Sequence, residues 1–433
     1  MHLARSNRSS QKTKTRLINI RKKEMLIIGN QMKKIIIPNR EDFPKTAEAV
    51  IIGGGIVGTA TAFWLSRAGV NTVLVEMRDG LSTLTTPSSV ECFRKQFTEP
   101  SMAELAKESI DVFENFPEVI GIPDWDIGLR HQGYLFYTDD SALIEPLQEA
   151  VQKHHELGVT DSEFLDKDDL RKRFPYLSDR VLAATFRQKD GWLSSHETTQ
   201  GFARGSQALF LLKTKAENIL VDKKGVAGVV TNRGTISTRA VINTAGPYAG
   251  EIGKMVGLDL PLKPVRRQKA YIAPNPQIPQ DAPMSIDIIR EVYFRPETGG
   301  ALIGWVDPEE PKSQPSENLP INRYFAAETL ELLSKTIPFW EKIAANLRGS
   351  DVKISAGQYV YTPDDQPLIG EIPAVPGFYL NCGFWAGVML APAAGKRIAD
   401  LYTGKLKPEY NPLRPTRYEE GLALEGSSFL RGH

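Results

Sequence analysis

Cysteine is scarce in this sequence: Cys92 and Cys382 are the only two in 433 residues. Two cysteines this far apart provide neither a disulfide framework nor the close spacing of a metal site, so no metal is expected. Long apolar runs are also absent, because no stretch approaches the roughly 20 residues that a membrane-spanning helix needs. These absences predict a protein of a reducing compartment, the cytoplasm, without a membrane span. Peripheral membrane association is left open.

Excess charge of either sign is also lacking, since the net charge is only +1, but the charges are unevenly distributed. Residues 1–40 contain eleven Lys and Arg and one acid, Glu24, which leaves the rest of the chain at −9. A basic arm of this kind fits binding to nucleic acid or anionic lipid, targeting, or a plain extension. Because nothing else in the chain suggests a nucleic-acid partner, we interpret residues 1–45 as a disordered basic extension.

The clearest pattern that is present combines a strand, a glycine-rich turn and a helix. Residues 48–52 (EAVII) form a short apolar run, as expected for a strand buried on both faces of a parallel sheet. Gly53, Gly55 and Gly58 follow in the G-x-G-x-x-G spacing, which permits a tight turn, close approach of a pyrophosphate and close helix packing. The helix expected at 56–68 presents its N-terminal amides to the phosphates.

A second apolar run, at 72–75, leads to Glu76, which lies 18 positions after Gly58. A carboxylate at this distance typically binds the ribose hydroxyls of an adenosine and disfavours the 2′-phosphate of NADP. The combination predicts a dinucleotide-binding site. From these residues alone, FAD and NAD both fit.

Later segments do not continue the regular succession of strands and helices of an NAD enzyme. Residues 80–97 are rich in hydroxyl side chains, so they fit either a segment wrapped along an extended cofactor or a solvated loop. Strands are expected at 226–231 and 235–242, joined by a turn. Another strand and glycine loop precede an amphipathic helix at 388–403, whose N-terminal amides predict a second anion or oxyanion site.

Five segments in order resemble the flavin-dependent D-amino-acid oxidase superfamily, in its branch of glycine oxidases, sarcosine oxidases and amine or amino-acid dehydrogenases. The resemblance covers roughly residues 47–410. It rests on VIIGGGIVGTATAFWLSRAG, SSVECFR, GVAGVVTNRGTISTRAVINTAGPYA, YTPDDQPLIG and GFWAGVMLAPAAGKRIADL. It implies FAD rather than NAD.

The resemblance also implies an α/β fold. A Rossmann-like FAD-binding domain, discontinuous in sequence, would lie beside an α+β substrate domain with an antiparallel sheet. We expect the FAD-binding domain at 46–120, 170–258 and 353–410, the substrate domain at 121–169 and 259–352, and a C-terminal tail at 411–433.

Cofactor contacts follow from the resemblance position by position. The first glycine loop and two serines would hold the pyrophosphate, an acid and an arginine the ribose, and the last glycine loop the pyrimidine edge of the flavin. The expected residues are Gly53, Gly55, Gly58, Glu76, Arg78, Ser88, Ser89, Ala245, Gly246, Gly387, Val388 and Met389. Relatives that bind FAD covalently carry a cysteine near the position of Gln358, so a non-covalent FAD is expected.

The chain departs from the family where substrate would bind. The arginine that holds the substrate carboxylate in glycine oxidase-like members is replaced by Tyr359 or Gln358, and Trp385 stands where some members have a basic residue. Another arginine could substitute for it, or aromatic side chains could form a pocket for an alkylamine or a larger ring. The substrate-pocket candidates are Arg94, Tyr293, Tyr359 and Trp385, with Arg290 and Arg295 as further arginines.

Leu302 stands where sarcosine oxidase-like members have an oxygen-activating lysine. This favours a dehydrogenase that passes electrons to a quinone or another protein over a fast oxidase that uses O2. We therefore expect FAD-dependent oxidation of the C–N bond of an amine or amino acid, resembling sarcosine, glycine or a D-amino acid, by hydride transfer to flavin N5. No residue is assigned as a catalytic acid or base.

Two alternatives stay open. The first is an FAD-dependent 2-hydroxy acid or polyol dehydrogenase, which would need a base such as His196. The second is a flavin-bearing subunit of a larger complex. A homo- or hetero-oligomer is compatible with each.

Overall fold

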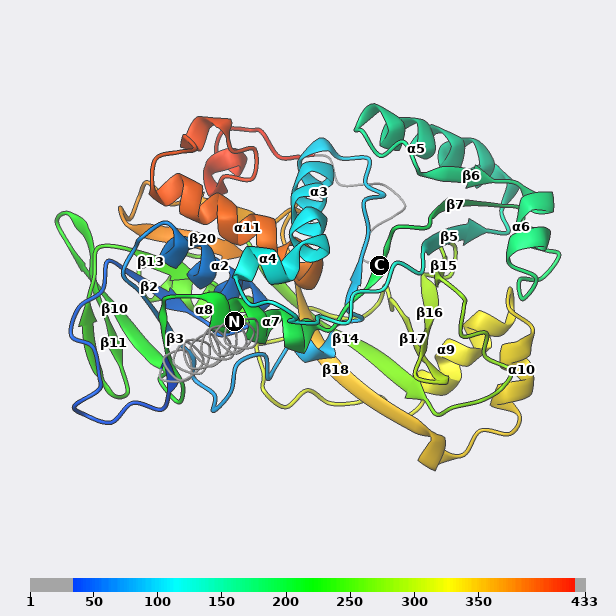
Figure 1. Cartoon of the computed structure of the whole chain (residues 1–433), viewed down its shortest axis with the longest axis horizontal. Coiled ribbons are helices and arrows are strands. Elements are labelled where there is room, and N and C mark those ends of the chain that lie inside the picture. Colours follow the sequence, from blue (N-terminus) through cyan, green and yellow to red (C-terminus); the bar gives the residue numbers. More distant parts are fainter. Residues whose placement is uncertain (1–33, 425–433) are drawn as a thin grey trace, which may run out of the picture.

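The computed structural model describes residues 34–424 and contains two large sheets (Figure 1). A mainly parallel sheet lies under α2 (Ile56–Arg67) and α11 (Gly387–Tyr402), on the left of the view. A mainly antiparallel sheet lies on the right, close to α9 (Phe325–Ser334) and α10 (Phe339–Ala344). This arrangement confirms the expected combination of a Rossmann-like part and an α+β part.

The first sheet has seven strands in the order β1-β9-β3-β2-β13-β20-β19, and only the β19–β20 pair is antiparallel. Apart from the half-buried edge strand β1, its strands are largely buried on both faces, which explains their apolar runs. Ile51 and Leu74 pack under the helices, whereas Val50 and Val73 pack against the β-meander described below. The strands are β1 (Ile35–Ile36), β2 (Ala49–Ile52), β3 (Thr72–Val75), β9 (Leu209–Leu211), β13 (Val241–Asn243), β19 (Leu368–Glu371) and β20 (Phe378–Cys382).

Small residues let the covering helices approach one another closely. A Cβ at Gly395 of α11 would lie 2.8 Å from the backbone of Ala60 in α2. Pro392 lies inside α11, and the amide of Ala393 donates to Ser109 Oγ of α3 (Pro100–Glu114) over 3.1 Å. This contact joins α3 to α11 where the proline disturbs the helix. The packing places the N-termini of α2 and α11 at one edge of the sheet.

The expected hairpin forms, but the expected strand 235–242 is divided. β10 (Ala216–Asp222), β11 (Gly225–Thr231) and β12 (Gly234–Ser237) make an antiparallel meander. The chain then bends and re-enters the seven-stranded sheet as β13. Thr238 holds the bend, because its hydroxyl donates to the carbonyl of Glu48 over 3.0 Å and accepts from the amide of Ala240 over 3.2 Å.

The second sheet has eight strands in the order β18-β14-β17-β16-β15-β5-β7-β6, antiparallel except for β15 and β5. One face packs on α9 and α10 through residues such as Phe294 and Trp340. The other face presents Tyr134, Tyr293 and Leu302. The strands are β5 (Tyr134–Thr138), β6 (Glu163–Leu165), β7 (Ala183–Arg187), β14 (Lys263–Ile272), β15 (Met284–Asp287), β16 (Val292–Glu297), β17 (Gly300–Trp305) and β18 (Val352–Tyr361).

Strand pairing differs in places from the division expected from the sequence. β7 and β18 fall within segments assigned to the FAD-binding domain, yet both pair in the eight-stranded sheet. β1 falls within the extension expected to be disordered, yet it pairs with β9; residues 1–33 lie outside the described residues. The domain boundaries themselves stay a prediction.

The expected C-terminal tail is packed against the protein over residues 411–418. Asn411, Leu413 and Arg417 are fully buried. Arg417 donates to both carboxylate oxygens of Asp364, each over 2.8 Å. A buried ion pair therefore fixes this segment to the loop that follows β18.

Candidate active site

A cavity lies at the carboxyl ends of the parallel strands, where open α/β sheets bind their ligands. Gly53 follows β2, Glu76 follows β3, Thr244 follows β13 and Gly383 follows β20, and all four line the cavity. Other lining residues come from the hydroxyl-rich loop, the start of α11 and the end of β18. They include Ser82, Thr83, Leu84, Thr85, Thr86, Ser89, Gln358, Tyr359, Phe384, Trp385, Gly387 and Val388.

The first glycine loop packs closely against Thr244 and Ala245, the residues that follow β13. Gly53 has φ +113°, and a Cβ there would lie 2.7 Å from the carbonyl oxygen of Thr244. A Cβ at Gly58 would lie 1.9 Å from the carbonyl oxygen of Gly53. The Thr244 hydroxyl donates to the carbonyls of Ile52 and Gly53 over 2.9 and 3.1 Å. Only glycine fits at positions 53 and 58, as the sequence pattern predicts.

Glu76 lies under the same loop. Its Oε2 accepts from the amide of Gly54 over 2.6 Å, and its Oε1 accepts from the amide of Arg78 over 2.8 Å. Burial raises the pKa of Glu76, and the two amide hydrogen bonds act against that rise. The Arg78 guanidinium forms an ion pair with Glu317. The carboxylate is thus fixed beside the glycine loop, where an adenosine ribose is expected.

Two helices begin at the cavity, and neither N-cap residue caps its helix with its own side chain. The N-cap of α2 is Gly55 and that of α11 is Ala386. In α2 the amide of Ile56 donates to Thr86 Oγ1 over 3.2 Å. The amides of such first turns favour negative charge. Gly387 and Val388, in the first turn of α11, line the cavity.

The residues present fit FAD. Three buried side-chain oxygens among the lining residues have no hydrogen-bond partner in the described part of the chain: Ser82 Oγ, Thr85 Oγ1 and Asn381 Oδ1. Buried polar atoms normally have partners, so these atoms indicate a polar ligand. One helix start suits a pyrophosphate and the other suits the electron-rich edge of a flavin ring.

Most of the predicted cofactor residues come together in this cavity. Nine line it: Gly53, Gly55, Glu76, Arg78, Ser89, Ala245, Gly246, Gly387 and Val388. Three do not. Gly58 packs on Gly53, Ser88 donates to the carbonyl of Ala356 over 3.0 Å, and Met389 is buried in the core under α11. Direct cofactor contact of the twelve residues stays a prediction.

Aromatic side chains adjoin the cavity beside the start of α11. Tyr359 and Trp385 line it, and the Trp385 indole Nε1 donates to the carbonyl of Asp365 over 2.8 Å. Tyr293 is buried on the face of the eight-stranded sheet, and its hydroxyl lies 2.3 Å from where a Cβ of Gly304 would be. Burial raises the pKa of both tyrosines, so both are neutral phenols at neutral pH.

Arg94 lies behind Trp385 and is completely buried. Its guanidinium carbon lies 4.5 Å from the ring centre of Phe97, 5.0 Å from Phe136 and 5.6 Å from Trp385. Such cation–π contacts stabilise a desolvated cation. Arg94 is not among the residues that line the cavity.

The two further arginines have other partners. Arg290 forms ion pairs with Asp139 and Asp287, over 2.8 and 2.7 Å. Arg295 donates to the carbonyl of Val90 over 3.1 Å and pairs with Glu297. Both pairings give these arginines structural roles within the sheet and its adjoining loops.

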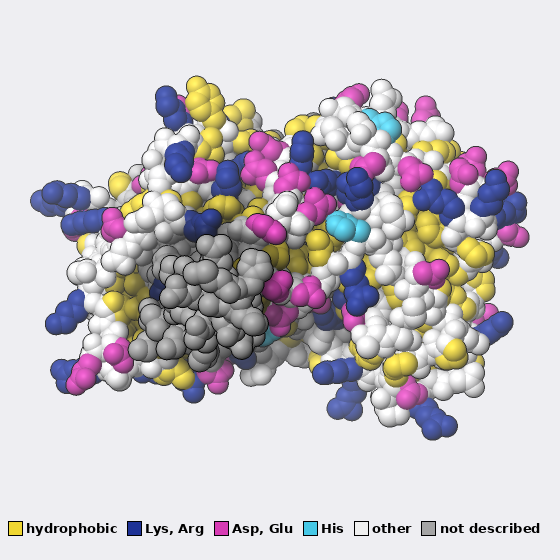
Figure 2. Space-filling model, in the orientation of Figure 1, with side chains coloured by type: hydrophobic (Ala, Val, Ile, Leu, Met, Phe, Trp, Pro, Cys, Tyr) yellow, Lys and Arg dark blue, Asp and Glu magenta, His cyan; other side chains and the backbone are white. Residues whose placement is uncertain are grey.

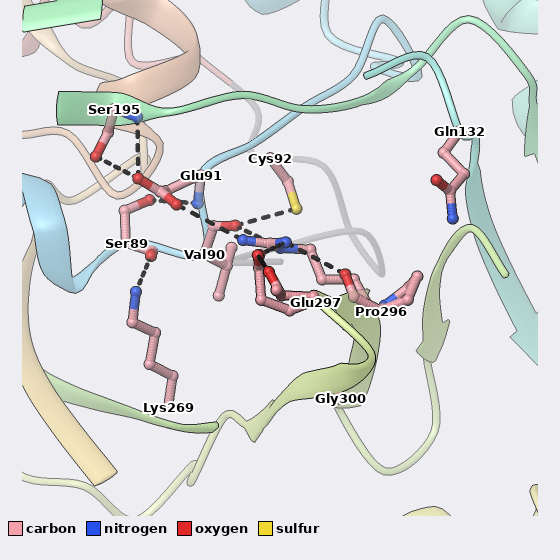
Figure 3. A network of polar contacts seen from close by, with 12 residues as sticks. Ser89, Val90, Glu91, Cys92, Gln132, Ser195, Lys269, Pro296, Glu297 and Gly300 are labelled. Atoms are coloured by element: carbon pink, nitrogen blue, oxygen red, sulfur yellow. Dashed lines mark hydrogen bonds and ion pairs between the residues drawn. The ribbon is translucent and has the colours of Figure 1, made fainter. Parts of the chain in front are cut away.

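Two cations on β14 were missed by the sequence analysis. Lys269 donates to the carbonyl of Ser89, as Figure 3 shows, and to that of Pro87 over 3.0 Å. It thereby holds the hydroxyl-rich loop that lines the cavity. Arg267 is half-buried near Tyr359 and Tyr361. Arg267 and Lys269 are two positions apart in the sequence, as side chains on one face of a strand are. This spacing does not show which face of the strand lies toward the cavity.

Comparison with known proteins identifies the class. The family model of FAD-dependent oxidoreductases (DAO) matches residues 48–401. The chain therefore belongs to this family, and FAD is its cofactor.

Relatives of this chain include amine and amino-acid dehydrogenases. Mitochondrial dimethylglycine dehydrogenase of Rattus norvegicus is 25% identical over 415 residues, which cover 90% of this chain and 48% of that protein. Mitochondrial sarcosine dehydrogenase of Homo sapiens is 26% identical over 381 residues, covering 82% and 39%. The chain thus spans about half the length of the first of these relatives and less of the second.

Solved structures share the fold. L-proline dehydrogenase from P. horikoshii has a TM-score of 0.78 at 27% identity, and the match covers 89% of this chain and 100% of that chain. Glycine oxidase from Bacillus cereus has a TM-score of 0.72 at 22% identity, covering 89% and 100%. The expected superfamily and fold are confirmed.

Within residues 34–424, no helix combines the length and apolarity of a membrane span, and no three His, Cys, Asp or Glu side chains gather as metal ligands. On the face drawn in Figure 2, basic and acidic side chains are interspersed rather than collected into a patch of one sign.

Proposed function

We propose that this protein oxidises the C–N bond of an amine or amino acid, using FAD to accept a hydride from the carbon beside the nitrogen. The observation that carries the proposal is the aromatic wall of Tyr359 and Trp385, which adjoins the start of α11 in the cofactor cavity. The dehydrogenases among the relatives act on molecules of this class by their names. Their similarity supports the assignment of the reaction type to this chain.

The residues around the cavity would bind and orient the substrate rather than exchange protons with it. Tyr359 is a neutral phenol because burial raises its pKa, and Trp385 is held by its bond to Asp365. Neutral aromatic faces bind the carbon skeleton of an amine and exclude water. The amides at the start of α11 would stabilise negative charge on the flavin ring. Positioning of this kind lets the cofactor carry the chemistry.

A 2-hydroxy acid or polyol substrate receives less support. Oxidation of an alcohol needs a base for the O–H proton. The described residues that line the cavity include no histidine, and His196 is exposed at the start of α7 (Ser195–Gly205). The C–N assignment needs no such base when the amine is neutral.

We further propose that electrons pass to a quinone or a protein rather than rapidly to O2. Leu302 lies in an apolar cluster with Tyr134 and Tyr293, and no lysine takes its place there. FAD is proposed to be non-covalent because Gln358 occupies the position of the tethering cysteine. A cytoplasmic location suits the two free, buried cysteines, although the two dehydrogenase relatives described above are mitochondrial. Oligomerisation with like or unlike subunits is compatible with this function.

Anaerobic reduction of the flavin tests the proposal. Protein loaded with FAD is mixed with amines, amino acids, 2-hydroxy acids and polyols, and the loss of the visible absorbance of oxidised flavin is followed for each. We expect bleaching by at least one amine or amino acid and slow recovery on admission of air. Bleaching only by hydroxy compounds, or failure to retain FAD, would contradict the proposal.

A further inference from the structure

A long segment that forms neither a helix nor a named strand connects β17 to α9. Residues 306–323, which we call the strap, pair with the sheet through an isolated bridge between Lys312 and Val265 of β14. Loops longer than about 15 residues without secondary structure of their own are uncommon in compact domains and usually have a function. The strap also reaches across to Arg78, which lines the cofactor cavity. Its course therefore connects the two parts of the molecule.

The strap lies along β14. Because β17 pairs with the last residues of β14, the first part of that strand is left for the strap. The amide of Ser313 donates to the carbonyl of Pro264 over 2.8 Å. Arg266 donates to both carboxylate oxygens of Glu310, each over 2.9 Å, and to the carbonyl of Pro320 over 2.7 Å. These contacts fix the course of the strap over the sheet.

Gln358 binds the middle of the strap. It lies opposite Arg266 in the register of β18 with β14, is 1% exposed and lines the cofactor cavity. Its Nε2 donates to Ser313 Oγ over 2.7 Å and to the carbonyl of Gln314 over 2.8 Å, and its Oε1 accepts from the amide of Ser316 over 3.0 Å. Separation would leave buried polar groups without partners, so the strap is firmly bound here.

The strap is held less firmly where it crosses to the nucleotide-binding part. There Glu317 forms an ion pair with Arg78, and the two side chains are 47% and 30% exposed. Ion pairs as exposed as this one contribute little to stability. Opening at Glu317 is therefore easier than release from Gln358.

A second cavity, of about 290 Å³, lies under the strap. Its lining includes strap residues 316–319 and Ile321, together with Leu84, Thr85 and Gln358. The last three also line the cofactor cavity, so the two cavities adjoin there. The strap thus forms a wall of a space that leads to the cofactor cavity.

We propose that the strap is a gate for FAD. The ion pair of Glu317 with Arg78 keeps the gate closed, and FAD enters and leaves when this pair opens while Gln358 keeps the strap attached to the sheet. Gln358 is then a positioning residue that acts on FAD retention through the strap. The inference rests on the FAD cofactor of the family and is independent of which substrate is oxidised.

A gate has a kinetic signature that a lost contact with FAD lacks. Weakening the ion pair raises the fraction of open protein, so the rates of FAD association and dissociation rise by the same factor and the dissociation constant changes little. Loss of a direct contact instead raises the dissociation rate and the dissociation constant together. Measurement of both rates therefore separates the two cases.

Glu317→Gln removes the charge and nearly preserves the shape of the side chain. We expect both rates to rise about two- to fivefold, the range for an exposed ion pair. Stopped-flow mixing of FAD with the full-length apoprotein measures association, and the rise in flavin fluorescence after dilution of the loaded protein measures dissociation. Glu309→Gln, which changes an exposed acid elsewhere in the strap, is the control and should alter neither rate.

Limited digestion with trypsin, in excess FAD, tests the role of Gln358. Lys312 and Arg323 lie near the two ends of the strap and are exposed. Gln358→Leu removes three hydrogen bonds to the strap, so cleavage after these two residues should accelerate by at least about tenfold. Glu317→Gln should accelerate it by about fivefold or less, because only the exposed ion pair is lost.

Equal rises in both rates that are confined to Glu317→Gln, with faster cleavage of the strap in Gln358→Leu, would support the gate. A dissociation constant that rises as much as the dissociation rate would overturn it, as would unchanged rates in Glu317→Gln or equal changes in Glu309→Gln. Cleavage no faster in Gln358→Leu than in the unmodified protein would overturn the positioning role of Gln358. The rates of Glu317→Gln decide the gate even where Gln358→Leu does not fold.

Discussion

The carbonyl oxygen of Gly53 occupies the place where a side chain at Gly58 would begin, since a Cβ there would lie 1.9 Å away. Gly58→Ala therefore forces the glycine loop away from α2. We expect this overpacking to cost about 1–3 kcal/mol and to weaken FAD binding by at least about tenfold. FAD fluorescence titration and thermal unfolding measure the two effects. Gly250→Ala is the control, because nothing lies within 4 Å of that Cβ; equal effects of both changes would contradict the prediction.

Glu76 is expected to contribute to FAD affinity through its fixed carboxylate. Glu76→Ala removes the acceptor of the Gly54 and Arg78 amides and the predicted contact with ribose. We expect a loss of affinity of about 10- to 100-fold, and a smaller loss for Glu76→Gln. Equilibrium titration of the apoprotein with FAD measures it. Glu48→Gln is a suitable control, because Glu48 accepts from the amide of Asn71 over 2.7 Å and is not among the residues that line the cavity. A comparable loss of FAD affinity in Glu48→Gln would show that the loss does not depend on a carboxylate in the cavity.

The ion pair of Asp364 and Arg417 should stabilise the fold. Arg417→Met leaves a buried carboxylate without its cation, which typically costs about 3 kcal/mol or more. Chemical unfolding monitored by tryptophan fluorescence measures the loss. Arg414→Met removes a more exposed pair with Glu420 in the same segment and should cost about 1 kcal/mol or less. Similar losses for the two variants would contradict a special role for the buried pair.

The ion pair of Asp364 and Arg417 also makes the free energy of unfolding depend on pH. Although burial acts to raise it, hydrogen bonds from Arg417 and Tyr418 lower the pKa of Asp364 to about 2, from 3.8 in the unfolded chain. Because the pKa is lower in the folded state, the carboxylate makes its full contribution to the free energy of unfolding above pH 3.8. This contribution is lost as the pH falls toward about 2. Acid titration of unfolding should show this loss in the parent protein, and Arg417→Met should reduce it. An unchanged acid transition would disprove the linkage.

Leu302 is expected to limit the reaction of reduced flavin with oxygen. A cation beside reduced flavin would stabilise the negative charge that develops on oxygen, so Leu302→Lys should raise the rate of reoxidation by about tenfold or more. Stopped-flow mixing of reduced protein with air-saturated buffer measures this rate. Leu302→Met tests the effect of shape alone and should leave the rate unchanged. If both variants reoxidise like the parent, Leu302 does not control the reaction.

Local patterns in the sequence predicted the helices and strands around the cavity well. The glycine spacing, the acid after the second strand and the final glycine loop are encoded within short segments, and β2, α2, β3 and α11 lie within a residue or so of their expected limits. The pairing of β7 and β18 in the eight-stranded sheet was not predictable in the same way. Antiparallel partners distant in sequence are chosen by long-range packing, which a single strand does not reveal.

The orientation of the charged side chains on β14 was harder to predict for a related reason. Arg266 and Arg267 lie on opposite faces of this strand, and a shift of one residue in the register of β14 with β18 would exchange them. Long-range packing sets this register, so residue type alone does not predict it.

The cavity joins residues 53–57, at the start of the described fold, to residues 383–388, near its end. Ribosomal synthesis therefore delivers the two ends of the cofactor site at very different times. The glycine loop can form early, but the helix start that would hold the flavin ring exists only after β20 and α11 have left the ribosome. We therefore expect FAD capture to be a late event in the maturation of this protein, so that a nascent chain arrested before α11 remains colourless.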